Sequence, residues 1–200
     1  AANTSANYNT AFGYASLLSN TTGQTNTAVG HQAMYYNTTG DNNVAVGPNS
    51  LLNNTTANNN TAIGYFTLTS NTTGTQNTAV GHQALYYNQT GNYNVAMGIN
   101  ALLNSTTSNN VGIGYFALNA QTSGFQNTAV GSQTLTGLTT GDDNTAMGEQ
   151  AAAGLTTGDR NTCIGKAAGY DLTTGSNNLL LGDDAGRSNS PAGVVNNESN

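Results

Sequence analysis

A strict internal period constrains the fold of this chain more than any other feature of the sequence. A motif of the form Asn-Thr-Ala-hydrophobic-Gly returns every 17 residues, and once after 16. Its closing glycines are Gly13, Gly30, Gly47, Gly64, Gly81, Gly98, Gly114, Gly131, Gly148, Gly165 and Gly182. We place the one missing residue between Leu103 and Asn104, just before a turn. Helical repeats need about 33 residues and leucine-rich repeats about 20, so the remaining solution is a coil of short strands.

The repeat predicts an all-β fold, a parallel β-solenoid of about eleven 17-residue rungs over residues 9–187. The position before each closing glycine is apolar in every unit, and the position two residues earlier is Thr, Val or Leu, which favours strands. The position between them is small. A second apolar row begins with Leu17, Met34 and Leu51. Residues 1–8 are expected to form an N-terminal cap or docking segment, and residues 188–200 a polar C-terminal tail.

Two columns of identical residues have a structural interpretation. The Asn column includes Asn26, Asn43, Asn60 and Asn77, and the glycine column includes Gly30, Gly47, Gly64 and Gly81. Stacked amides can hydrogen-bond from one rung to the next, as Asn ladders do in cross-β stacks. The glycines are expected to take a positive φ or to allow a close approach of backbone. We therefore assign neither column to an active site.

The composition excludes several classes of function. The chain has three Lys and Arg residues against nine Asp and Glu, which provides no basic surface for nucleic acid. No apolar run approaches the roughly 20 residues that span a bilayer, so we expect no membrane insertion. The sequence contains no nucleophile elbow, phosphate-binding loop or paired cysteine motif. Cys163 stands in the small row and is expected to be a buried, inert thiol. We predict that the chain is not an enzyme, with no catalytic residue, no cofactor and no metal.

Charged residues gather in the last rungs. Equivalent positions carry Glu149, Lys166 and Asp183 in one column, Asp143 and Arg160 in a second, and Asp142 and Asp159 in a third. Alternating sign at one-rung spacing predicts ion pairs in the first two columns. The like-charged third column could attract a cation, although no calcium-loop pattern accompanies it.

Two histidines occupy equivalent positions three rungs apart. His31 and His82 are thus expected to lie about 14 Å apart and cannot share a metal within one chain. Across a symmetric oligomer each could meet its own copies, but a solvated or interface histidine is the favoured interpretation.

Six asparagines begin Asn-x-Thr sequons in what the period makes one column: Asn20, Asn37, Asn54, Asn71, Asn88 and Asn104. N-glycosylation is one interpretation. The favoured one is that Asn-Thr-Thr-Gly is the turn itself, because rungs this close would crowd bulky glycans.

Aromatic residues are the better candidates for binding. They occur in four pairs, which are Tyr35 and Tyr36, Tyr86 and Tyr87, Tyr65 and Phe66, and Tyr115 and Phe116. Exposed tyrosines on a polar rod suit contact with carbohydrate or protein, because the ring provides area and the hydroxyl a hydrogen bond. The same rings could instead fill an interface between identical chains, and both alternatives stay open.

The repeats, above all Asn77-Thr-Ala-Val-Gly-His-Gln-Ala-Leu85, resemble the head repeats of trimeric autotransporter adhesins of the YadA-like group. They are equally similar to the Asn-Thr-Ala-x-Gly repeats of some phage tail fibres. The resemblance implies a left-handed parallel β-roll, homotrimeric and displayed on a cell or virion surface, that binds a host glycan or matrix. The period of 17 is longer than is usual in the bacterial heads.

These features together predict an extracellular structural or adhesive protein, a fibre or adhesin-head segment that presents a repetitive surface. The alternative is a self-polymerising filament, because the ends of a solenoid are open sheet edges. Ice binding is favoured least, since the Thr pairs such as Thr21-Thr22 are adjacent and strand alternation would send one of each pair to the opposite face.

Overall fold

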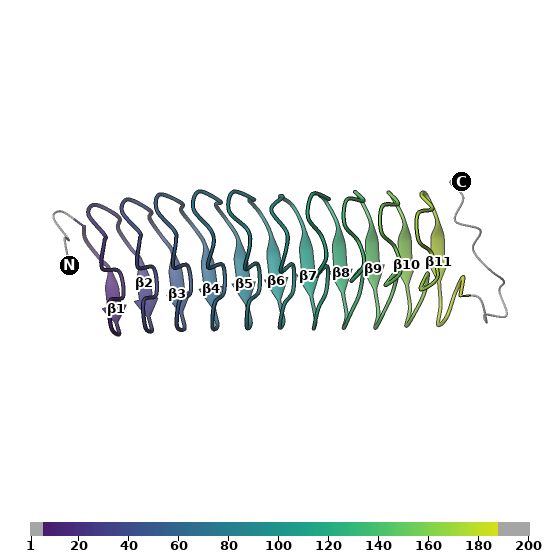
Figure 1. Cartoon of the computed structure of the whole chain (residues 1–200), viewed down its shortest axis with the longest axis horizontal. Helices are drawn as coiled ribbons and strands as arrows, with labels where there is room; N and C mark the ends of the chain where they lie inside the picture. The colour runs from purple at the N-terminus through teal and green to yellow at the C-terminus, as the bar shows by residue number, and fades with distance from the viewer. Residues whose placement is uncertain (1–5, 188–200) are drawn as a thin grey trace.

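The chain forms the coil of parallel strands that its period predicts. The computed structural model describes residues 6–187. This part contains eleven three-residue strands: β1 (Thr10–Phe12), β2 (Thr27–Val29), β3 (Val44–Val46), β4 (Thr61–Ile63), β5 (Thr78–Val80), β6 (Val95–Met97), β7 (Val111–Ile113), β8 (Thr128–Val130), β9 (Thr145–Met147), β10 (Thr162–Ile164) and β11 (Leu179–Leu181). They form one sheet in sequence order, one strand per rung (Figure 1). The predicted parallel β-solenoid is confirmed.

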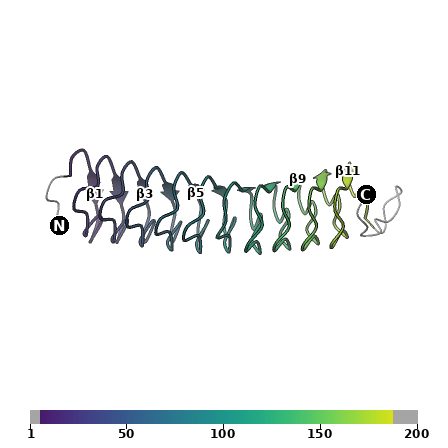
Figure 2. The same cartoon turned by 90° about the horizontal axis from the view of Figure 1, so that it is seen from above.

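The register of the sheet follows the period. Each strand pairs in parallel with the next, so that Thr27 faces Val44 and Thr61 faces Thr78. The rungs stack along one axis into a rod, with β1 near one end and β11 near the other (Figure 1, Figure 2). Residues 1–5 of the predicted N-terminal segment, and all of the predicted tail at 188–200, lie outside the described residues.

The strands place their small residue inside and their larger residues outside. Ala28, Ala45 and Ala62 are fully buried, and the flanking residues of each strand are half-buried or exposed. The apolar residue before each closing glycine therefore faces outward, as at Ile63 (40 % exposed) and Met97 (39 % exposed). We call the outward side of the eleven strands the sheet face.

The second apolar row fills the interior from a turn and not from a strand. Leu51, Leu68 and Leu85 are fully buried, and they take φ angles of 48°, 49° and 53°. A left-handed backbone cannot continue a β-ladder, which explains why each rung carries one strand where the sequence shows two apolar segments. The leucine side chains leave little room for the small residues of the strands, which face them across the interior. A Cβ added at Gly112, the one glycine in the small row, would lie 3.0 Å from Cγ of Leu102.

We expect Leu85→Ile to destabilise the rod by about 2–3 kcal/mol and Leu85→Met by less than about 1.5 kcal/mol. The two replacements are close in volume, but a β-branched side chain is strained at the positive φ of this position. Methionine already occupies the equivalent position at Met34, where φ is 51°. Urea unfolding followed by circular dichroism measures both. Equal losses in the two variants would show that backbone conformation does not select the residue.

The Asn column forms the predicted ladder. Asn77 is fully buried, and its Nδ2 donates to Oδ1 of Asn60 (3.2 Å) and to the carbonyl oxygen of Gly91 (2.8 Å). Its own Oδ1 accepts from the backbone N–H of Asn94 (3.0 Å) and from Nδ2 of Asn94 (3.1 Å). The Asn77 amide thus joins three successive rungs, and this bonding explains how a polar group can occupy the interior without an energetic penalty.

In the structure, the one-residue gap of the 16-residue rung lies at a different place in the turn from the one predicted. Hydroxyl-to-carbonyl hydrogen bonds join Thr106 to Thr122, 16 residues on, and Thr107 to Gly124, 17 residues on. The gap therefore lies between Thr106 and Thr107, and the predicted position between Leu103 and Asn104 is wrong. Ser105, and not Asn104, occupies the column of the sequon asparagines. The rung spacing alone could not distinguish these positions, because a turn can absorb the loss at several points.

Candidate functional site

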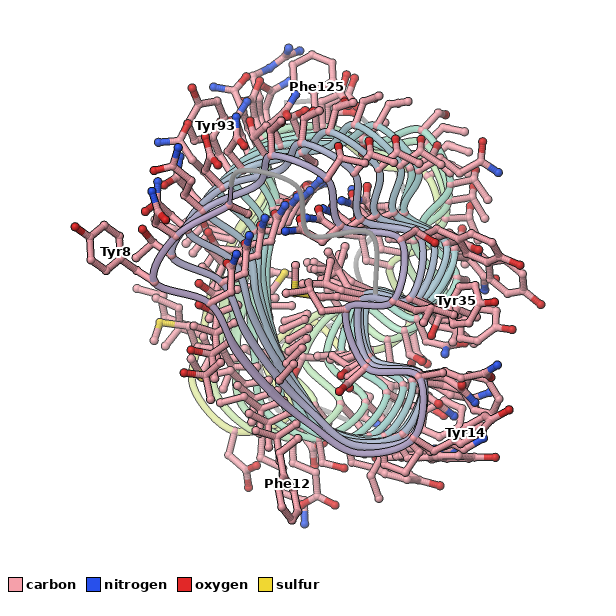
Figure 3. The ribbon with its side chains drawn as sticks, turned by 90° about the vertical axis from the view of Figure 1, so that its left-hand side faces the viewer. Tyr8, Phe12, Tyr14, Tyr35, Tyr93 and Phe125 are labelled. Atoms are coloured by element: carbon pink, nitrogen blue, oxygen red, sulfur yellow. The ribbon has the colours of Figure 1, made fainter. Side chains whose placement is uncertain are left out.

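The predicted aromatic residues lie along one side of the rod, and some of them touch. In the middle rungs, ring centroids are 4.3 Å apart for Tyr65 and Phe66, 6.0 Å for Phe66 and Tyr86, and 4.7 Å for Tyr86 and Tyr87. These four rings form one continuous cluster. We call this side of the rod the tyrosine face. Figure 3 shows it at Tyr35, across the section from the strand that runs between Tyr8 and Phe12.

The other predicted aromatics form separate pairs on the same columns. Tyr35 and Tyr36 pack edge to face with centroids 4.6 Å apart, and Tyr115 and Phe116 lie 4.5 Å apart. In the rungs after Tyr115 the aromatic pairs end, although a single ring returns to the Tyr86 column at Tyr170. Thr136 and Gly137 stand where Tyr86 and Tyr87 would be expected, so the third block of rungs lacks the protruding rings.

A second row of rings lies next to the glycine turn, and of its members only Tyr65 was assigned to the site from the sequence, not Tyr14, His31 or His82. The His31 ring stacks on Tyr14 with centroids 5.4 Å apart and planes at 15°, and His82 stacks on Tyr65 at 5.6 Å and 21°. The signal was present in the sequence. Each of these four residues directly follows a closing glycine, and the second pair repeats the first three rungs later. The sequence favoured solvated or interface histidines over metal ligands but did not predict that their rings stack on tyrosines.

Tyr36 and Tyr87 differ from these stacked rings. They are 49 % and 51 % exposed. The neighbours of Tyr36 in its own column are Ser19 and Asn53, which carry no ring. Tyr36 is one wall of an open hollow of about 510 Å³, whose other lining residues are Ser19, Thr38, Asn53, Thr55 and Thr72. The hollow therefore combines one aromatic wall with hydroxyl and amide groups.

The hydroxyls of the hollow are held in place by the main chain. Oγ1 of Thr38 donates to the carbonyl oxygen of Thr55 (3.0 Å), and Oγ1 of Thr55 donates to that of Thr72 (3.2 Å). Each hydroxyl is thereby oriented and keeps its lone pairs as acceptors for a ligand. A smaller hollow of about 220 Å³ lies in the C-terminal rungs, lined by Gln133, Thr136, Gln150, Ala153, Gly154 and Tyr170.

The sequon asparagines are structural. Asn37 is fully buried, and its Nδ2 donates to Oδ1 of Asn20 (2.8 Å) and to the carbonyl oxygen of Gly40 (3.1 Å). Asn54, Asn71 and Asn88 repeat the pattern. A glycan needs this same nitrogen, so the folded rod cannot carry glycans on this column. The turn interpretation holds, and it applies to Asn104 only as a neighbour of the column.

One of the predicted ion pairs forms and one does not. Nζ of Lys166 lies 3.5 Å from Oε2 of Glu149, with both side chains more than half exposed, so the pair adds about 1 kcal/mol or less. Within the described residues Asp183 joins no ion pair. The expected pair of Asp143 and Arg160 is wrong, because Nε of Arg160 donates forward to Oδ1 of Asn177 (2.8 Å).

The stacked carboxylates serve the backbone. Oδ1 of Asp142 accepts the N–H of Phe125 (2.9 Å), and Oδ1 of Asp159 accepts the N–H of Asp142 (3.0 Å). Each carboxylate thus links its own rung to the preceding one, as Asp41 does for Gln24. This bonding accounts for the like-charged column without a cation.

Three other features bear on the chemistry of the rod: clusters of metal ligands, apolar helices and the single cysteine. Among residues 6–187, His, Cys, Asp and Glu side chains nowhere gather in a group of three or more that could hold a metal ion. The same part of the chain has no helix with the length and apolar character needed to cross a membrane. Cys163 is buried, and burial raises the pKa of its thiol to about 11, so the group is protonated at neutral pH and a poor nucleophile.

No family model, curated protein or solved structure matches the chain. The function of the rod therefore has to be inferred from its own geometry and chemistry.

Proposed function

We propose that this chain is a non-enzymatic structural and adhesive rod, a fibre or adhesin-head segment displayed outside a cell or virion, and that it works as a homo-oligomer. The tyrosine face is its adhesive surface. The observation that carries the proposal is the sheet face, along which the last residue of every strand is an outward apolar side chain, in a continuous band from Phe12 to Leu181.

The sheet face has the size and chemistry of an interface. Eleven strands each present two outward side chains, close to the roughly 20–30 residues that each partner contributes to a standard interface. Of these 22 side chains 15 are apolar and seven are threonine, and a continuous apolar band of this length is larger than isolated surface residues would explain. A second copy of the chain offers the same band at the same spacing, and the resemblance to trimeric heads favours three copies around one axis.

Replacing Ile63 and Met97 with lysine tests this assembly. We expect the wild-type chain to have the mass of a discrete oligomer, three chains in the favoured case, and the Ile63→Lys/Met97→Lys variant to have the mass of a monomer, because burying two unpaired charges is costly. Native mass spectrometry measures both, and Thr90→Lys adds charge at an exposed turn residue outside the sheet face as the control. A wild-type chain that stays monomeric at micromolar concentration would contradict the assembly.

A filament is the second candidate, favoured by one observation. Within the described residues β1 and β11 each pair on one side only, so each end of the sheet has a free edge. End-to-end stacking would extend the sheet, and electron microscopy would then show long fibres that lengthen with concentration. The interior of the last rung differs from the others, because Leu180 takes the place of the small residue and packs against the core. This difference gives the discrete oligomer more support than the filament.

A further inference from the structure

We infer that the hollow beside Tyr36 and its repeat beside Tyr87 are a pair of subsites for an uncharged polysaccharide lying along the rod. This inference rests on the proposed adhesive function and names the ligand class of its tyrosine face. The hollow at Tyr36 presents one tyrosine ring as a platform for a sugar with oriented threonine hydroxyls beside it. The subsite at Tyr87 is assigned from the same residue columns three rungs on.

The geometry of the ring fits a sugar. Tyr36 packs edge to face against Tyr35, with their planes at 67°, and has no ring next to it in its own column. The ring is about half exposed at 49 %, and the apolar C–H side of a pyranose can pack on an exposed ring face while its hydroxyls reach hydrogen-bond partners. Thr38 and Thr55 supply those partners from the same hollow.

The stacked row beside the glycine turn does not offer the same platform. The ring planes of Tyr14 and His31 meet at 15°, and those of Tyr65 and His82 meet at 21°. In each stacked pair, one ring covers a face of the other. A sugar cannot pack against a face that another ring occupies. In these two stacked pairs one face of each ring is covered, whereas Tyr36 and Tyr87 have no ring next to them in their own columns.

The interval between the two platforms indicates a chain-like ligand. Tyr36 and Tyr87 are 51 residues apart, which is three rungs, or about 14 Å along the rod. The positions equivalent to the lining of the first hollow carry Ser70, Gln89, Asn104, Thr106 and Thr122 around Tyr87. All of them are polar and uncharged. One extended polymer that reaches both platforms gains the second contact at high effective concentration.

The charge distribution selects an uncharged ligand. Asp41 is the only Asp, Glu, Lys or Arg among the first 141 residues, and the other charged side chains follow it in the C-terminal rungs. Anionic polysaccharides and phosphate groups are bound by arginine and lysine, which this part of the rod does not contain. The tyrosine face can therefore hold a ligand through stacking and neutral hydrogen bonds alone.

Affinity electrophoresis of the full-length chain tests the inference. The gels contain dextran, soluble starch, laminarin or galactomannan as neutral probes, and alginate or polygalacturonate as anionic ones. We expect retardation by at least one neutral polymer and by neither anionic one. Tyr36→Ala and Tyr87→Ala should each weaken binding about tenfold, the double variant should abolish the retardation, and Tyr36→Phe should retain most of it.

The matched control is Tyr93→Ala, which removes an exposed tyrosine from the same rod outside the two hollows. It should leave the retardation unchanged, and circular dichroism should show all variants folded. Retardation only by anionic polymers, no retardation by any neutral one, or equal loss in Tyr93→Ala would overturn the inference. Adhesion of the wild-type rod to cells or matrix protein is measured separately. If the rod adheres to cells or matrix protein but does not bind neutral polysaccharides, the proposed adhesive function is supported and the proposed ligand class is wrong.

Discussion

Replacing Gly81 with alanine is expected to lower the free energy of unfolding by about 4 kcal/mol, because the rungs at this point leave no space for a methyl group. A Cβ at Gly81 would lie 2.5 Å from the carbonyl oxygen and 2.7 Å from the carbonyl carbon of Gly98. Both atoms belong to the backbone of the next rung, so no side chain can rotate away. The φ of +131° adds strain, since residues other than glycine rarely adopt it. The shift in the urea midpoint measures the total.

Gly182→Ala separates these two causes. Gly182 closes the last rung with a similar φ of +116°, but a Cβ there would meet nothing within 4 Å. This variant should carry the conformational cost of about 1–3 kcal/mol without the clash, so it should lose about 2 kcal/mol less than Gly81→Ala. Equal losses would show that rung-to-rung contact does not explain the glycine column.

The period was enough to predict the strands, the parallel pairing and the Asn ladder, because stacking identical units leaves few other ways to bury their apolar residues. It was not enough to say which apolar row lies inside. Alternation puts Ala62 on one side of its strand and Thr61 and Ile63 on the other, and the larger residues are the obvious choice for a core. The opposite arrangement holds, because the leucine row already fills the interior from the turn and leaves room only for alanine opposite.

The site was harder to predict than the fold for a related reason. The aromatic residues were identifiable by their three-rung interval, but ring contacts depend on the turn. Phe66 has a φ of 55°, and from this left-handed position its ring lies against both Tyr65 and Tyr86. Likewise, the column position of Arg160 did not predict its hydrogen bond to Asn177 in the next rung. Side-chain direction in such turns follows from backbone angles that the sequence pattern does not specify.

Asn77→Asp is expected to cost about 3–5 kcal/mol at neutral pH, although it changes one atom of a side chain. The introduced carboxylate loses the two hydrogen bonds that Nδ2 donates to Asn60 and Gly91. It also places a negative charge next to Oδ1 of Asn60 and the carbonyl oxygen of Gly91, at a site with no solvent contact. Since both oxygens and burial disfavour the ionised form, the pKa of the new carboxyl should be raised in the folded state. Urea unfolding across a pH series measures the loss.

The direction of the pH dependence follows from this raised pKa. In the unfolded chain the carboxyl ionises near about pH 3.9, and in the folded chain only at higher pH. The unfolded state therefore binds fewer protons between the two values, so the variant loses stability as pH rises through that window and gains it as pH falls. Asn59→Asp makes the same chemical change at an exposed position with a φ of 60°, which aspartate tolerates, and should cost less than about 0.5 kcal/mol. If both variants lost the same stability with the same pH profile, net charge would explain the effect and the buried ladder would not.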